Sequence, residues 1–169
     1  MKTLLTAPDI EYLRGQQMKL DEDIIRKNGI THDEWMDDLH TNHIIALRVE
    51  VAEFVNEARE WKYWKKKPID RERVIDEAVD VIHFLMLILN KNRSGLSDDE
   101  VADAVETAMP DESANIKDIL HSMLVEHAYN EILAYLLYVL NDYNFTTQDI
   151  LEAYNRKNKV NFERLESGY

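Results

Sequence analysis

The sequence has 169 residues and no cysteine, a length that favours one domain and a composition that excludes disulfides and thiolate metal sites. Its formal net charge of −13 argues against binding to nucleic acid, because such binding depends on cationic contacts with phosphates. The longest apolar stretch, Val81–Leu89, is far shorter than the about 20 residues that span a bilayer, so we expect a cytoplasmic protein without membrane contact.

Helical periodicity dominates the chain. Only four glycines and three prolines occur, and strands and tight turns use these residues heavily. The segments whose apolar residues recur at helical spacing are 9–28, 39–62, 71–90, 97–109, 116–141 and a last one that begins at Thr146 or Thr147. No stretch of any length alternates with the two-residue period of a strand. We therefore expect an all-α fold, a bundle of four to five main helices in a single domain over residues 1–169.

Several residues mark the expected helix ends. Gly29 can end the first helix in a left-handed conformation. Thr31 with Glu34, and Ser97 with Glu100, have the spacing of capping boxes, in which each side chain accepts a hydrogen bond from the other residue's backbone N–H. A Lys-Lys-Lys-Pro run is expected to end the second long helix.

The expected helix 71–90 carries acidic residues in apolar surroundings. Between positions 74 and 89 the residues that are not apolar are Asp76, Glu77, Asp80 and His83. A helix that is hydrophobic nearly all round is normally buried on most sides, and a buried carboxylate needs a cation or hydrogen bonds to compensate its lost hydration. Glu77 and Asp80 are three residues apart and therefore share one helix face.

The preceding helix repeats this spacing with Glu50 and Glu53 at the edge of its apolar stripe. Two consecutive antiparallel helices would bring this pair together with Glu77 and Asp80. Four clustered carboxylates repel one another, and hard divalent cations such as Mg²⁺ resolve that repulsion by binding their oxygens. Two such ions roughly 4 Å apart would form a two-metal site for phosphoryl chemistry. They would also allow so acidic a protein to bind a triphosphate.

Other interpretations of these carboxylates stay open from the residues alone. A Glu-x-x-Glu pair on a helix is usually a solvated face, and a Glu-x-x-Asp pair in an apolar helix can instead form salt bridges with Arg or Lys. A di-iron carboxylate bundle is the inorganic rival, but it uses Glu-x-x-His pairs, and no Glu of this sequence has His three residues later.

The order Glu50-x-x-Glu53 and then Glu77-x-x-Asp80 resembles the metal-binding signature of the all-α nucleotide pyrophosphatases, which include dimeric dUTPases and MazG-like enzymes. Four blocks are similar to the bacterial and phage branch of the dimeric dUTPases: residues 17–24, 46–68, 77–85 and 154–169. The resemblance covers most of the chain, and residues 93–115 read as a variable insert.

The resemblance implies a homodimer that hydrolyses dUTP to dUMP and diphosphate by attack on the β-phosphorus. Mg²⁺, as two or more ions per site, would be bound by Glu50, Glu53, Glu77 and Asp80. Glu50 or Glu53 would also orient or deprotonate the attacking water, and electrostatic stabilisation would supply most of the catalysis. The sequence leaves open whether Mn²⁺ replaces Mg²⁺ and whether dUDP is also a substrate.

Candidates for binding the base lie on the first and third helices. Gln17 interrupts an apolar stripe, and its amide could pair with a uracil edge or be satisfied within the core. Asp21 follows one turn later. His83 and Phe84, one turn beyond the acidic pair, could line the base or deoxyribose pocket, although a lone helical His is more often structural.

A further set lies at the end of the second long helix. Trp61 and Trp64 are expected either to stack on the base or to pack in the core, and packing is the commoner role. Asn56 is expected to support the metal ligands.

The C-terminal segment 154–169 would close over the substrate. Its candidate binding residues are Lys157, Asn158, Asn161, Arg164 and Tyr169. Lys157 and Arg164 would neutralise phosphate oxygens, and Asn161 would contact the base or sugar. A solvated basic helix end is the alternative. The sequence departs from the family pattern at Leu165, where Gln is expected.

Two other functions are compatible with the same fold. A MazG-like pyrophosphatase of broader specificity would act on dCTP or modified nucleotides, but MazG-like chains usually lack the Gln17 block and the C-terminal segment. A non-catalytic helical binding protein could use its acidic surface against a partner, but here all four carboxylates are intact. Hydrolysis of dUTP is therefore the function that the sequence predicts.

Overall fold

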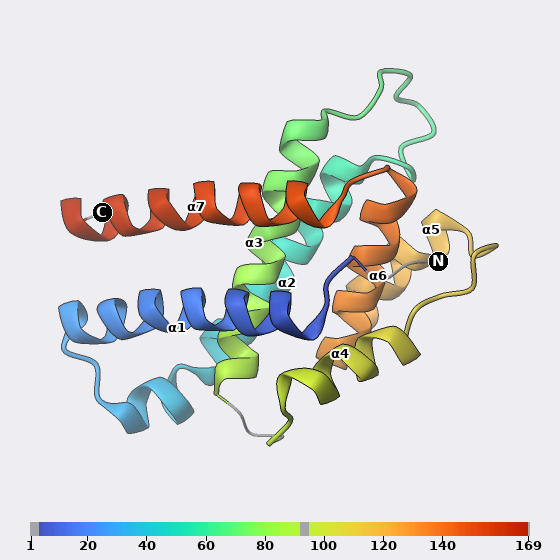
Figure 1. Ribbon diagram of the computed structural model, residues 1–169. Coiled ribbons are helices and arrows are strands. Elements are labelled where there is room, and N and C mark those ends of the chain that lie inside the picture. Colours follow the sequence, from blue (N-terminus) through green and yellow to red (C-terminus); the bar gives the residue numbers. More distant parts are fainter. Residues whose placement is uncertain (1–3, 92–94, 169) are drawn as a thin grey trace.

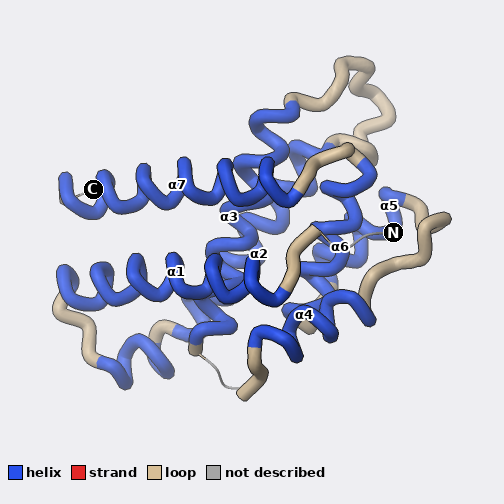
Figure 2. Tube along the Cα trace, viewed as in Figure 1, coloured by secondary structure: helices blue, strands red, loops and turns tan. Residues whose placement is uncertain are grey.

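Most of the described backbone is helical, as the sequence predicts. The computed structural model describes residues 4–91 and 95–168, and within these ranges it contains helices and connecting loops but no strand (Figure 2). The helices are α1 (Ala7–Asn28), the π-helical turn η1 (Glu34–Asp38), α2 (His40–Ala58), α3 (Arg71–Asn90), α4 (Asp98–Thr107), α5 (Ile116–Val125), α6 (Tyr129–Asp142) and α7 (Thr147–Ser167). None of the described helices is long and apolar enough to cross a membrane.

Helix α3 lies at the centre of the bundle, and α2 packs along it (Figure 1). Helices α1 and α7, the first and last long helices, lie side by side, run in the same direction and both cross α3. The shorter α4 and α5 pack against α6 at the other end of the molecule. Segments from the two ends of the chain therefore meet over the middle of α3.

This central position explains why α3 is apolar nearly all round. Its buried residues are Val74, Ile75, Ala78, Val79, Val81, Ile82, His83, Leu85, Met86, Leu87 and Ile88. They face α2, α1, α7 and α6 in turn, so they cover most of the circumference of the helix. The acidic residues of α3 occupy the remaining face, which is only partly buried.

The expected helix 39–62 is shorter than predicted, because α2 ends at Ala58 and Arg59 adopts a left-handed conformation with φ of 62°. Side chains from the following turn bind the carbonyl groups that the helix end leaves open. The Trp61 indole N–H donates to the Val55 carbonyl at 3.1 Å, and the Lys62 ammonium donates to the Asn56 carbonyl at 2.7 Å. These bonds replace the next helical turn.

The expected single helix 116–141 is wrong, because the chain breaks into α5 and α6 at Glu126. That residue is extended, with ψ of 147°, and its carboxylate accepts from the backbone N–H groups of His127 and Ala128 at 2.6 and 2.8 Å. Local side-chain bonds of this kind compete with helical ones. The apolar periodicity continues across the break because α5 and α6 pack against the same core.

The predicted helix caps are confirmed. Gly29 ends α1 in a left-handed conformation, with φ of 63°. Ser97 and Glu100 form the capping box of α4. Thr31 and Glu34 exchange the same hydrogen bonds at the start of η1. The cap residues thus locate helix starts more reliably than apolar periodicity locates helix ends.

Replacing Phe54, which is fully buried on α2 against the core, tests this packing. We expect Phe54→Ala to lower the free energy of unfolding by about 3–5 kcal/mol, because it leaves a cavity that the helices cannot close. Urea unfolding followed by circular dichroism measures the change. Lys19→Ala, at an exposed position of α1, is the control and should change stability by less than about 0.5 kcal/mol. Equal effects of the two changes would contradict the packing described here.

Candidate functional site

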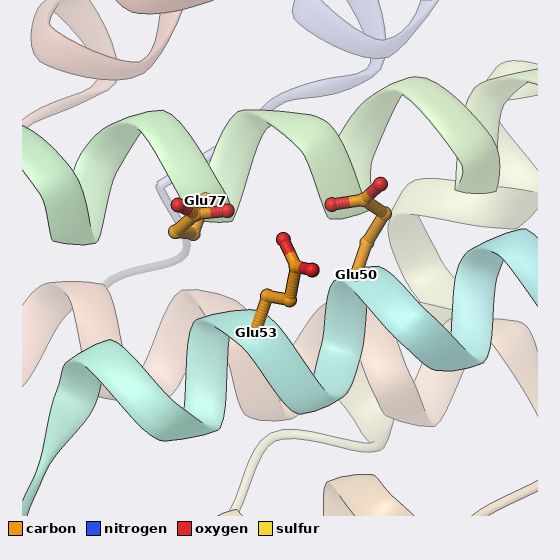
Figure 3. A group of neighbouring side chains, drawn as sticks. All are labelled: Glu50, Glu53 and Glu77. Atoms are coloured by element: carbon orange, nitrogen blue, oxygen red, sulfur yellow. The ribbon is translucent and has the colours of Figure 1, made fainter.

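Three carboxylates from two helices converge at the seam between α2 and α3. One oxygen each from Glu50, Glu53 and Glu77 lies within 4.8 Å of the other two. Figure 3 shows the two α2 side chains and the α3 side chain meeting between the two helices. The three-residue spacing on α2 places Glu50 and Glu53 on the same face, as the sequence predicts.

Asp80, the fourth predicted carboxylate, lies one turn beyond Glu77 on α3. Its carboxylate forms an ion pair with the Lys157 ammonium of α7 at 2.6 Å. Asp80 also raises the pKa of both Glu50 and Glu77, so its charge acts on the other acidic groups. Residues of three helices thus contribute to one charged cluster.

Burial and mutual repulsion disfavour the ionised forms of Glu50, Glu77 and Asp80. Burial raises the pKa of Glu50 to about 7, and the charges of Asp80, Glu53 and Glu77 add to the shift against the opposing charge of Lys157. Burial is also the first cause that raises the pKa of Glu77 and of Asp80. A set of oxygen donors with excess negative charge is the environment that suits hard divalent cations. The residues present therefore fit Mg²⁺.

A cavity of about 470 Å³ opens beside this cluster, between α1, α3 and α7. Nine of the predicted site residues line it: Gln17, Asp21, Glu50, Asp80, His83, Phe84, Lys157, Asn161 and Arg164. Its acidic end, at Glu50 and Asp80, is shared with the carboxylate cluster. Apolar residues of α1 and α3, among them Leu20 and Leu87, line it as well. This volume falls within the range typical of small-molecule sites.

Deeper in the molecule, a hydrogen-bonded group joins α1, α3 and α7. The Gln17 amide N–H donates to the Asp21 carboxylate at 2.7 Å, and the Gln17 carbonyl oxygen lies 2.7 Å from His83 Nδ1. The Tyr154 hydroxyl donates to the same Gln17 oxygen at 3.2 Å. Burial raises the pKa of Asp21 to about 7, against the lowering effect of its bond from Gln17.

Other predicted residues lie apart from the cavity lining. Trp61 and Trp64 pack edge to face with ring centroids 5.5 Å apart in the loop after α2, and both are exposed. Asn56 accepts a hydrogen bond from the neighbouring Lys62 side chain. Asn158 is buried on α7, and its Oδ1 has no hydrogen-bond partner. Tyr169 lies outside the described residues.

Tyr154 is the main residue of this region that sequence reasoning did not single out. It is fully buried, stacks on His83 and bonds to Gln17. Its spacing of three residues from Lys157, on the same helix face, is the signal that could have found it. Leu165, noted for its departure from the family pattern, also lines the cavity.

Comparison with known proteins identifies the family. A family model described as dUTPase matches residues 9–169. The chain belongs to the dUTPase family. It is accordingly a dUTP diphosphatase of the all-α type, which is the family and activity that the resemblance of its sequence motifs implies. A search of curated proteins found no match.

The raised pKa of Glu50 predicts how the stability of this dUTPase depends on pH in EDTA. Its folded pKa of about 7 exceeds the ordinary 4.5, so ionising Glu50 costs more in the folded protein than in the unfolded chain. This cost sets in above about pH 4.5 and is complete above about pH 7. We expect Glu50→Gln to stabilise the metal-free protein at pH 8 by about 1 kcal/mol, after allowance for screening by solvent, and to have no effect at pH 4.

Urea unfolding at both pH values measures this difference. Glu11→Gln, at an exposed position of α1, is the matched control and should change stability little at either pH. An unchanged stability of Glu50→Gln at pH 8 would show that the Glu50 carboxylate is not destabilised by its neighbours.

Proposed function

We propose that this dUTPase hydrolyses dUTP to dUMP and diphosphate with Mg²⁺ ions bound by Glu50, Glu53, Glu77 and Asp80. The observation that carries the proposal is the convergence of three carboxylates within 4.8 Å, one of which, Glu50, lines a cavity that also contains cationic side chains. Such a donor set is suited to two ions that bridge a polyphosphate. When bound, the ions would neutralise phosphate charge and activate the attacking water.

The side chains around the cluster have complementary roles in this proposal. Glu50, with a pKa of about 7 in the metal-free protein, is suited to orient water and to accept its proton near neutral pH. Lys157 and Arg164 line the same cavity from α7 and would bind phosphate oxygens. The attack is expected to fall on the β-phosphorus, so that dUMP leaves with its α-phosphate.

The lining of the cavity suggests the orientation of the nucleotide. The charged groups of Glu50, Asp80 and Lys157 suit the triphosphate. The Gln17 and His83 side chains are buried, and their polar groups can contact a neutral base. Phe84 lies beside His83 and adds a flat apolar surface that would contact the base or deoxyribose.

We also propose that the enzyme is a homodimer that associates through α2. Ile45 and Val49 are one turn apart on the outer face of α2 and are 59% and 48% exposed. Helix α5, which packs against α2, adds the exposed side chains of Leu124 and Val125. Exposed large apolar side chains on two helices that pack together favour association with another protein surface. A second copy of the chain would cover them in a symmetric contact.

The first experiment measures diphosphate release from dUTP, dCTP, dTTP and UTP with Mg²⁺ and with EDTA. We expect turnover of dUTP that EDTA abolishes. Asp80→Asn should lower kcat/KM on the order of a thousandfold, because the variant loses one charged ligand of the cluster. Asp76→Asn is the control on the same helix, since Asp76 pairs with Arg156 and, unlike Asp80, is not among the residues that line the cavity. It should keep near-normal turnover.

Several results would contradict the proposed function. Turnover that persists in EDTA, or in Asp80→Asn with Mg²⁺, would remove the metal assignment. Comparable turnover of all four nucleotides would instead indicate a pyrophosphatase of broad specificity. No turnover of any nucleotide would favour a non-catalytic binding protein.

The dimer is tested by sedimentation velocity on the wild type and on Ile45→Glu/Val49→Glu. Two charges on the proposed contact face should convert the dimer to a monomer, because each carboxylate would be buried without a partner. Met18→Glu, at an exposed apolar position of α1, should remain dimeric. A wild type that sediments as a monomer, or a double variant that stays dimeric, would contradict this contact.

A further inference from the structure

The His83 side chain is buried, lines the cavity and has one unpaired nitrogen. Its ring stacks on Tyr154 with centroids 4.0 Å apart and an interplanar angle of 21°. One nitrogen, Nδ1, lies 2.7 Å from the Gln17 carbonyl oxygen. The other nitrogen, Nε2, is buried without a hydrogen-bond partner among the described residues, and the residue is only 5% exposed. An unpaired polar atom in such a position costs free energy unless a ligand binds it.

The neighbours of His83 determine which of its nitrogens carries the proton. An ionised Asp21 only accepts hydrogen bonds, so the Gln17 amide must present its N–H to Asp21 and its carbonyl oxygen to His83. The Tyr154 hydroxyl, 3.2 Å from the same oxygen and 3.3 Å from the Leu13 carbonyl, has one proton for these two acceptors, so it is compatible with this orientation of Gln17 but does not set it. His83 must therefore donate through Nδ1.

The ring is also neutral, because burial and the charge of Lys157 lower the pKa of His83 to about 3. A neutral imidazole that is protonated at Nδ1 has a lone pair at Nε2. The unpaired nitrogen is thus an acceptor, and the ligand atom that it suits is a donor. This assignment holds above about pH 7, where Asp21 is ionised.

The bases of dUTP and dCTP differ at N3, the ring nitrogen that a hydrogen-bond acceptor on the protein can distinguish. Uracil in a nucleotide has one N–H donor, at N3, whereas cytosine has a lone pair at N3. We propose that His83 Nε2 accepts the hydrogen bond of uracil N3–H and so selects uracil over cytosine, with Gln17, Asp21 and Tyr154 as positioning residues. The inference rests on the proposed function, in which this cavity binds dUTP.

The contact is assigned to the base and not to the sugar. A deoxyribose hydroxyl both donates and accepts, so it would bind either tautomer of His83. A fixed tautomer of His83 would therefore give no selectivity at the sugar. At the base it does, because the lone pair of His83 Nε2 would face the lone pair of cytosine N3. Neither atom would then have a hydrogen-bond partner.

The experiment compares kcat/KM for dUTP, dCTP and dTTP at pH 8 with Mg²⁺ in the wild type, His83→Phe and Asp21→Asn. His83→Phe keeps a flat ring against Tyr154 but has no acceptor. Its ratio of dUTP to dCTP should fall on the order of ten- to a hundredfold. Its ratio of dUTP to dTTP should stay within about twofold, because uracil and thymine share N3–H.

Asp21→Asn tests the chain of hydrogen bonds from Asp21 through Gln17 to His83 without changing His83 itself. The amide of Asn can donate as well as accept, so Gln17 is no longer held in one orientation and His83 can take either tautomer. We expect a smaller loss of discrimination against dCTP and, again, an unchanged ratio of dUTP to dTTP. This variant keeps the inference testable should His83→Phe fail to fold.

Nitrogen-15 NMR of histidine-labelled protein provides a direct measurement. The His83 signals, assigned by their absence in His83→Phe, should show a protonated Nδ1 and an unprotonated Nε2 at pH 8. A non-hydrolysable α,β-imido dUTP should shift the Nε2 signal, and the corresponding dCTP analogue should not. A protonated Nε2 in the free enzyme would overturn the inference.

The kinetic outcomes separate the two proposals. A wild type without preference for dUTP contradicts the proposed function and the inference with it. A selective wild type whose dUTP to dCTP ratio is unchanged in His83→Phe overturns the inference alone. An equal loss for dUTP and dCTP also overturns it, because that result would place Nε2 against the sugar.

Discussion

The structure depends on the concentration of negative charge at the seam of α2 and α3. Glu50, Glu53 and Glu77 lie within 4.8 Å of one another, and Asp80 follows one turn later. Helix α3 is otherwise buried nearly all round, so its acidic face must lie where α2 and α7 leave the core open. Burial and repulsion both raise the pKa of Glu50 and Asp80, so the ionised cluster is costly to the folded protein without a compensating cation.

Helix α7 links this charged region to the hydrogen-bonded group of Gln17, Asp21 and His83. Lys157 pairs with Asp80, while Tyr154, one turn earlier, stacks on His83 and bonds to Gln17. The same helix therefore contacts both the groups suited to phosphate and those suited to the base. Because α1 and α7 come from opposite ends of the chain, the cavity forms only when the whole bundle is folded (Figure 1).

Where the sequence-based expectation was wrong, hydrogen bonds between side chain and backbone are the reason. Helix α2 was expected to continue to 62, yet Trp61 and Lys62 bind its last carbonyl groups. The break at Glu126 is of the same kind, since its carboxylate binds two backbone N–H groups. Apolar periodicity does not register such bonds, because it reports which face is buried and not whether the backbone is continuous.

The sequence by itself determined the all-α class, the capped helix starts and the acidic pairs, because each depends on residues within one or two helical turns. It also placed Gln17, His83 and Lys157 among the candidates for binding. Only the tertiary structure decided how these residues meet: Gln17 and His83 are 66 positions apart, and Gln17 and Tyr154 are 137 apart. The tautomer of His83 follows from those contacts. Spacing along a helix specifies a shared face, but hydrogen bonds between distant segments depend on how the helices cross.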